Sequence, residues 1–156
     1  MTEPQTTPGL GIVAAFSGFA VPDIDAARAF YADTLGLTVR DGGMGLLRLE
    51  LPGGAEVMVY PKPDHVPAVF TILNFAVSDI DAAVDALLAR GVSFERYPGS
   101  PQDDKGIAHD PRGPQIAWFT DPAGNILSVL QNVLQDDLRQ DDLRQDDLRQ
   151  DDGAPA

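Results

Sequence analysis

Hydrophobic residues recur along the chain with two different periods, and the same succession of periods occurs twice. A continuous apolar stretch, which predicts a buried strand, is followed each time by a segment of helical period, which predicts an amphipathic helix. The first strand and helix are expected at residues 12–21 and 24–35, and the second pair at 69–77 and 80–90.

The two copies also agree in their residues. Residues 19–27, FAVPDIDAA, recur as residues 75–83, FAVSDIDAA, with eight of nine positions identical at a spacing of 56 residues. In each copy an aspartate, Asp23 or Asp79, comes directly before the helix, where aspartate is a preferred N-cap. A match of this length indicates an internal duplication, and a duplicated unit suggests a core with pseudo-two-fold symmetry.

Short strands separated by turns complete both copies. They are predicted at 37–40, 46–51 and 56–60 in the first copy, and at 92–97, 115–120 and 125–131 in the second. Asp41-Gly42-Gly43 predicts a turn. The proline-rich segment 98–114 predicts a long loop that is either a functional cover or without fixed structure. The sequence therefore predicts an α+β fold of two βαβββ repeats, residues 12–61 and 69–131, after an N-terminal arm at 1–11.

The composition restricts the partners of the chain. It has 156 residues, no cysteine and a formal net charge of −13, so it has neither disulfides nor a thiolate metal site. The negative charge disfavours nucleic-acid phosphates and anionic membrane surfaces as partners. No apolar run approaches the roughly 18 residues of a membrane span. The first residues lack the basic and apolar regions of a signal peptide, so a cytoplasmic location is expected.

The acidic C-terminal tail, residues 132–156, contains the sequence DDLRQ three times between Asp136 and Gln150. A five-residue period places no apolar stripe along a helix, which argues against a packed helix. The Asp and Arg residues at i and i+3, in contrast, form pairs that favour a helix. The pattern is compatible with a polar helix and with a disordered segment. A tail that itself binds a partner is one hypothesis for its function.

The doubled βαβββ pattern, the segment FAVPDIDAARAFYADTLGL and the closing DPAGNILSVLQ resemble the vicinal oxygen chelate superfamily, the group of glyoxalase I, bleomycin-resistance proteins and extradiol dioxygenases. The resemblance covers about residues 12–131. It implies two modules that form a half-open eight-stranded barrel around a cavity, and it implies a homodimer. The superfamily includes lyases, isomerases, dioxygenases and drug-sequestering proteins, so the fold alone does not identify an activity.

Metal-dependent members of this superfamily place His, Gln or Glu ligands at four strand positions. The resemblance puts Phe16, Ile72 and Ser128 at three of these positions. The fourth lies on the last strand of the first copy, where Glu56 is the only carboxylate. Phenylalanine and isoleucine offer no nitrogen or oxygen to a metal. We therefore expect neither a metal nor another cofactor, with a divalent metal as the alternative.

The cavity that the resemblance implies has a mostly apolar wall, because side chains of period two along its strands point inward. An apolar pocket with a few polar groups suits a small organic ligand. Asn74 is a candidate for orienting a ligand carbonyl, or it forms a hydrogen bond within the sheet. The candidate ligand-binding residues are Phe16, Met58, Tyr60, Ile72, Asn74, Trp118, Ser128 and Leu130.

Two residues are candidates for catalysis. Glu56 is a candidate general base and Tyr60 a candidate acid or hydrogen-bond donor. The two histidines, His65 and His109, are expected in exposed loops. The leading hypothesis is a protein that binds or sequesters a small organic compound without a metal. The alternatives are a metal-independent isomerase or lyase that uses Glu56 or Tyr60, and a metal-dependent lyase or dioxygenase.

Overall fold

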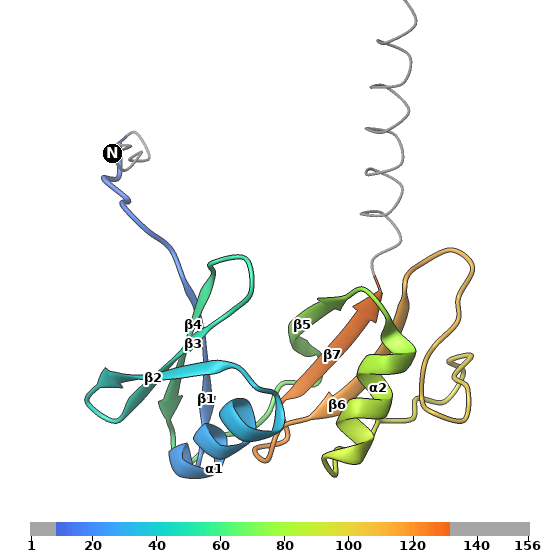
Figure 1. Ribbon diagram of the computed structural model, residues 1–156. Helices are drawn as coiled ribbons and strands as arrows, with labels where there is room; N and C mark the ends of the chain where they lie inside the picture. Colours follow the sequence, from blue (N-terminus) through green and yellow to red (C-terminus); the bar gives the residue numbers. More distant parts are fainter. Residues whose placement is uncertain (1–8, 132–156) are drawn as a thin grey trace, which may run out of the picture. The chain divides into compact units, whose positions relative to one another are not determined.

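A computed structural model of the chain describes residues 9–131 (Figure 1). The described residues form two compact units, unit 1 with residues 9–72 and 121–125, and unit 2 with residues 73–120 and 126–131. The elements follow the order β1 (Ser17–Val21), α1 (Ile24–Ala29), η1 (Phe30–Thr34), β2 (Thr38–Gly43), β3 (Leu46–Glu50), β4 (Glu56–Pro61), β5 (Thr71–Val77), α2 (Ile80–Ala89), β6 (Gln115–Thr120) and β7 (Ile126–Gln131). The mixed α+β class predicted from the sequence is confirmed.

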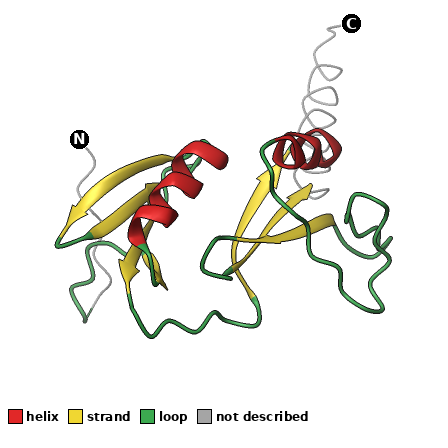
Figure 2. Ribbon diagram, turned by 90° about the horizontal axis from the view of Figure 1, so that it is seen from below, coloured by secondary structure: helices red, strands yellow, loops and turns green. Residues whose placement is uncertain are grey.

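Unit 1 contains a four-stranded sheet in the order β1-β4-β3-β2, in which β1 runs parallel to β4 and the other pairs are antiparallel. Helix α1 lies over one face of this sheet (Figure 2). Alternate residues of the strands point to that face and are buried, among them Leu47, Leu49 and Val59. The other face carries the residues between them, and it is this face that holds the candidate site.

The first helix changes its hydrogen-bond pattern after two turns. Asp23 caps α1 by accepting hydrogen bonds from the backbone N–H groups of Asp25 and Ala26, at 3.0 and 3.1 Å. From Phe30 onward the chain forms the π-helical turn η1, closed by a bond from the N–H of Leu35 to the carbonyl of Phe30. The prediction of one α-helix to residue 35 is wrong past Ala29, because hydrophobic periodicity locates the buried face and does not distinguish α from π hydrogen bonding.

The hairpin between β2 and β3 turns later than predicted. Strand β2 extends through Gly43 with a bulge at Gly42, and the turn is formed by Met44 and Gly45. Both turn residues have positive φ angles, 54° and 76°, as a two-residue hairpin turn matching the strand twist requires. The predicted turn at Asp41-Gly42-Gly43 is therefore wrong. Glycine at 42 serves the bulge instead.

Unit 2 contains a three-stranded sheet in the order β5-β7-β6, with α2 beside β6 and β7 (Figure 1). Asp79 caps α2 by accepting from the N–H of Ala82 at 3.0 Å. The helix contributes Ile80, Val84 and Leu87 to the buried core, where the strands contribute residues such as Phe119 and Leu127. The predicted second helix is confirmed, with Arg90 as its C-cap.

The strand predicted at 92–97 is wrong. Within the described residues this segment makes one isolated bridge, from Phe94 to Phe119. The side chain of Gln102 takes the place of a strand partner, since it accepts from the N–H of Tyr97 and donates to the carbonyl of Glu95, both at 2.8 Å. The described strands number seven, and the eight-stranded half-barrel implied by the resemblance stays a prediction.

The remaining boundaries concern the ends of the described chain. The predicted strand 12–21 is wrong in its first half, because β1 begins at Ser17 and residues 12–16 are exposed. The predictions for the tail at 132–156 lie outside the described residues. Within the described part, no helix has the length and hydrophobicity to cross a membrane.

Candidate functional site

A cavity of about 380 Å³ opens on the face of the unit-1 sheet that α1 does not cover. Its apolar wall includes Phe16 from the segment before β1, Leu46 from β3 and Met58 from β4. Leu46 and Met58 alternate along their strands with the buried Leu47 and Val59, so the period of two that fills the core on one side lines the cavity on the other. We call this the unit-1 cavity.

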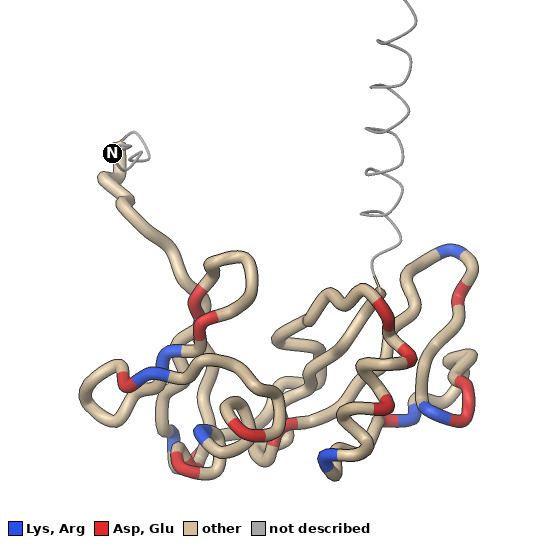
Figure 3. The backbone as a smooth tube through the Cα atoms, viewed as in Figure 1, with Lys and Arg blue, Asp and Glu red and all other residues tan. Residues whose placement is uncertain are grey.

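The charged side chains that line the unit-1 cavity form an ion pair. The Nη2 group of Arg48 on β3 donates to Oε2 of Glu56 on β4. The hydrogen bond to Glu56 and its negative charge raise the pKa of Arg48 further above its ordinary value. A second ion pair joins Arg40 on β2 to Glu50 on β3. Basic and acidic residues are interspersed over the two units rather than gathered by sign (Figure 3).

Three of the predicted site residues meet in the unit-1 cavity: Phe16, Glu56 and Met58. Tyr60 lies two residues beyond Met58 on β4, with 40% of its surface exposed. Arg48 was missed by the sequence analysis. Its signal was available, because Leu46-Leu47-Arg48-Leu49 alternates in a strand, and the position between two buried leucines must point to the opposite face.

The other predicted ligand residues lie on β5, β6 and β7. The hydroxyl of Ser128 donates to Oδ1 of Asn74 at 2.5 Å, and Ser128 is fully buried. Trp118 is the cross-strand neighbour of Ser128 and packs edge-on against Tyr97, with ring centroids 5.3 Å apart. Asn74 therefore forms the hydrogen bond within the sheet that was its alternative interpretation. Ile72 on β5 and Leu130 on β7 are half-buried, and a ligand-binding role for these residues stays a prediction.

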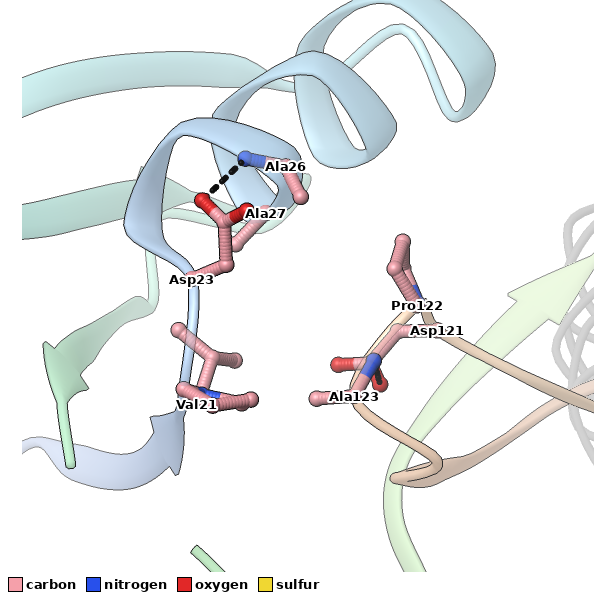
Figure 4. Close-up of a pocket in the computed structure, with 8 residues that line it drawn as sticks. Val21, Asp23, Ala26, Ala27, Asp121, Pro122 and Ala123 are labelled. Atoms are coloured by element: carbon pink, nitrogen blue, oxygen red, sulfur yellow. Dashed lines mark hydrogen bonds between the residues drawn. The ribbon is translucent and has the colours of Figure 1, made fainter. Parts of the chain in front are cut away.

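A second cavity of unit 1, of about 130 Å³, lies between the start of α1 and the turn at 121–125 (Figure 4). Val21, Ala27 and Ala123 contribute to its wall. Asp23 also faces it, but this carboxylate is the N-cap of α1. The cavity is small, and its acidic side chains already accept hydrogen bonds from the protein.

The turn at 121–125 is held by a buried polar network. Asp121 is 4% exposed and accepts a hydrogen bond from the Tyr31 hydroxyl at 2.7 Å. It also accepts from the N–H groups of Ala123 and Asn125 and from the Asn125 side chain, each at 2.9 Å. Burial, the charge of Asp121 and this hydrogen bond raise the pKa of Tyr31 far above its ordinary value. Tyr31 is therefore a structural donor, a role that the sequence analysis did not foresee.

The residues at the superfamily's metal positions do not fit a divalent ion. Phe16, Ile72 and Ser128 offer at most a hydroxyl, which is bonded to Asn74, and Glu56 is paired with Arg48. Among residues 9–131, no group of three or more His, Asp and Glu side chains is placed to hold a metal. That the chain binds no metal stays a prediction.

The histidines lie in the predicted loops. His109 forms a hydrogen bond with Asp103 at 2.8 Å and has 44% of its side chain exposed. His65 is half-buried, and its Nε2 atom has no hydrogen-bond partner. The expectation of exposure is correct for His109 and wrong for His65.

The chain is similar to proteins of one family. The sequence profile of the Glyoxalase/Bleomycin resistance protein/Dioxygenase superfamily matches residues 12–129. No curated protein matches the chain.

Three similar solved structures show the same fold. TnmS3, an antibiotic binding protein from Streptomyces sp. CB03234, is 25% identical over 77% of this chain and 97% of its own, with a TM-score of 0.56. A superfamily member from Sphaerobacter thermophilus DSM 20745 is 24% identical over 77% and 98%, with a TM-score of 0.58. A lactoylglutathione lyase from Agrobacterium tumefaciens is 22% identical over 78% and 95%, also with a TM-score of 0.58.

Proposed function

The chain belongs to the Glyoxalase/Bleomycin resistance protein/Dioxygenase superfamily, and on this premise we propose that it binds or sequesters a small organic compound in the unit-1 cavity. The observation that carries the proposal is this cavity, in which an apolar wall adjoins one ion pair. Its volume of about 380 Å³ is within the usual range for small-molecule pockets. The similarity to an antibiotic binding protein at 25% identity supports binding rather than a specific reaction.

The wall of the unit-1 cavity suits an aromatic or aliphatic ring. Phe16 is 65% exposed, so an apolar molecule that covers it removes hydrophobic surface of both partners from water. Met58 has a flexible, polarisable side chain that adapts to ligands of different shape. A role of Glu56 as a general base is less well supported, because its carboxylate is already paired with Arg48.

Equilibrium dialysis of the full-length chain against 2-naphthylmethanol tests the proposal, because this probe has an aromatic body and no charge. We expect saturable binding at one site. Phe16→Ala and Met58→Ala should each weaken it by about fivefold or more, since each removes apolar contact area worth about 1 kcal/mol.

Phe70 provides a matched control, because it is 67% exposed and does not line the unit-1 cavity. Phe70→Ala should leave the affinity for 2-naphthylmethanol unchanged. The proposal is wrong if the wild-type chain shows no saturable binding up to about 1 mM probe. It is also wrong if all three variants bind the probe as the wild type does.

A further inference from the structure

Arg48 and Glu56 are the charged side chains that line the unit-1 cavity. We propose that the cavity selects small apolar molecules that carry an acidic group, and that Arg48 binds this group. The ligand class is thus the organic acids with a hydrophobic body, such as aromatic carboxylates, sulfonates and phenolates. The inference rests on the proposed function, which it makes more specific.

The guanidinium of Arg48 has capacity to bind a second acceptor. A guanidinium presents N–H donors along more than one edge and binds carboxylates in a planar, two-pronged geometry. Glu56 accepts from Nη2 through one oxygen. The Arg48 side chain is also the more accessible partner, with 51% of its surface exposed against 39% for Glu56. A ligand carboxylate can therefore join Arg48 while Glu56 stays bound.

Gly42 lets the Arg48 side chain lie along the wall of the cavity. A Cβ atom at position 42 would lie 3.2 Å from Cγ of Arg48 and 3.3 Å from Cβ of Leu46, which is closer than ordinary van der Waals contact. Gly42 is also the residue at which the pairing of β2 with β3 shifts register. Bulges often lie beside binding sites, where they redirect a side chain, and here the bulge residue leaves room for Arg48.

A cationic ligand is the less favourable occupant. To bind Glu56 it would compete with a guanidinium that is already held beside this carboxylate by the β3–β4 pairing. The charges around this pair balance, because Arg40 lies across from Arg48 and Glu50 lies across from Glu56. The net charge of −13 opposes anions at long range. At physiological salt this repulsion is screened over about 8 Å, so the contact with Arg48 decides.

Three probes with the same ring separate charge from shape: 2-naphthoate, 2-naphthylmethanol and 2-naphthylmethylamine. For the full-length chain we expect a dissociation constant for the acid about tenfold below those of the alcohol and the amine. Arg48→Met should bring the ratio of the alcohol and acid dissociation constants from about ten to about one. Arg40→Met is the matched control, because Arg40 pairs with Glu50 and does not line the cavity, and it should keep the preference.

Glu56→Gln tests whether Glu56 competes with the ligand for Arg48. It removes the competing carboxylate, so the acid should bind at least as tightly as it does to the wild type. Urea unfolding of each variant verifies that the fold is intact.

Equal affinities for the acid and the alcohol would overturn the inference and leave the proposed function standing. Tightest binding of the amine, lost in Glu56→Gln, would make Glu56 the selective residue and would also overturn it. Failure of all three probes to bind would overturn the proposed function itself.

Discussion

The two units of this chain begin with nearly the same sequence and differ in what their sheets present on the face away from the helix. Both helices start at an aspartate N-cap, and in both the carboxylate binds the N–H three residues ahead, that of Ala26 or Ala82. Both helices cover a face of buried aliphatic residues. The duplicated sequence therefore specifies the cap and the helix-covered core in each unit.

On the opposite face the two units diverge at corresponding positions. In unit 1, Gly18 on β1 pairs with Met58 on β4, beside the unit-1 cavity. Asn74 lies 56 residues after Gly18 and is hydrogen-bonded to the buried Ser128. Unit 1 thus has a residue without a side chain where unit 2 has a polar pair. The difference teaches that the repeat retains the residues that build each unit, while the strand position of Gly18 and Asn74 differs between the copies.

The largest expected effect concerns the polar groups that each unit buries. Asp121→Ala removes the acceptor of four hydrogen bonds and leaves the Tyr31 hydroxyl and two backbone N–H groups of unit 1 without a partner. We expect it to lower the free energy of unfolding by about 3–5 kcal/mol. Urea unfolding of the full-length chain at pH 7 measures this change.

Ser128→Ala is the matched change in unit 2. It removes one hydrogen bond, to the exposed Asn74, and should lower the free energy of unfolding by only about 1 kcal/mol. Equal losses of unfolding free energy in the two variants would contradict this prediction. They would show that the hydrogen bonds of Asp121 do not stabilise the fold more than the bond between Ser128 and Asn74.

The second prediction concerns Gly18→Asn, which places in unit 1 the residue that unit 2 has at the corresponding position 74. Asn at position 18 would project beside Met58, because a Cβ atom there lies 3.3 Å from the Met58 carbonyl oxygen. Gly18→Asn should therefore weaken 2-naphthylmethanol binding by about tenfold, with a stability change of roughly 1 kcal/mol or less. Equilibrium dialysis and urea unfolding measure the two quantities.

Gly113→Asn is the control, because a Cβ atom at position 113 would meet no other atom within 4 Å and the φ angle of Gly113 is not positive. It should change neither binding nor stability. If Gly18→Asn binds the probe as the wild type does, the absence of a side chain at Gly18 is not what distinguishes the two sheets.

The sequence predicts the features that depend on the structural preferences of single residues and on the spacing of hydrophobic residues. The aspartate N-caps, helix α2 and the strand alternation follow from these, and the alternation is what places Met58 on the cavity face of β4. The superfamily could be identified from the doubled βαβββ pattern together with the segments FAVPDIDAARAFYADTLGL and DPAGNILSVLQ. Three of its four metal-ligand positions could then be expected at single residues, Phe16, Ile72 and Ser128.

The features that escape prediction depend on side chains that replace or modify backbone pairing. Gln102 satisfies the backbone of residues 95 and 97, so a segment with strand-like residues does not become a strand. The hydrogen bond from Tyr31 to Asp121 joins residues 90 positions apart, and no local sequence pattern predicts it. For Arg48 the strand alternation indicates the face, but only the pairing of β3 with β4 places it beside Glu56.

The smallest expected effect concerns the segment 98–114, a long connection in unit 2 where unit 1 has short hairpins. Partial burial alone raises the pKa of Asp103, but hydrogen bonds from His109, Ile107 and Lys105 outweigh it and lower the pKa below its ordinary value. A depressed folded-state pKa stabilises the fold fully above the unfolded pKa of about 3.9, and this contribution is lost as the pH falls from there through the lower folded-state pKa.

Asp103→Asn keeps an oxygen acceptor and removes the charge. It should lower the free energy of unfolding by about 0.5–1 kcal/mol at pH 7, and the difference from the wild type should shrink when urea unfolding is repeated near pH 3. Asp104→Asn, at the exposed neighbouring position, should have little effect at either pH. A deficit for Asp103→Asn that is equally large at both pH values would mean that the Asp103 carboxylate orders this segment by shape rather than by charge. The stability that Asp103 gives to the long connection of unit 2 would then be independent of pH.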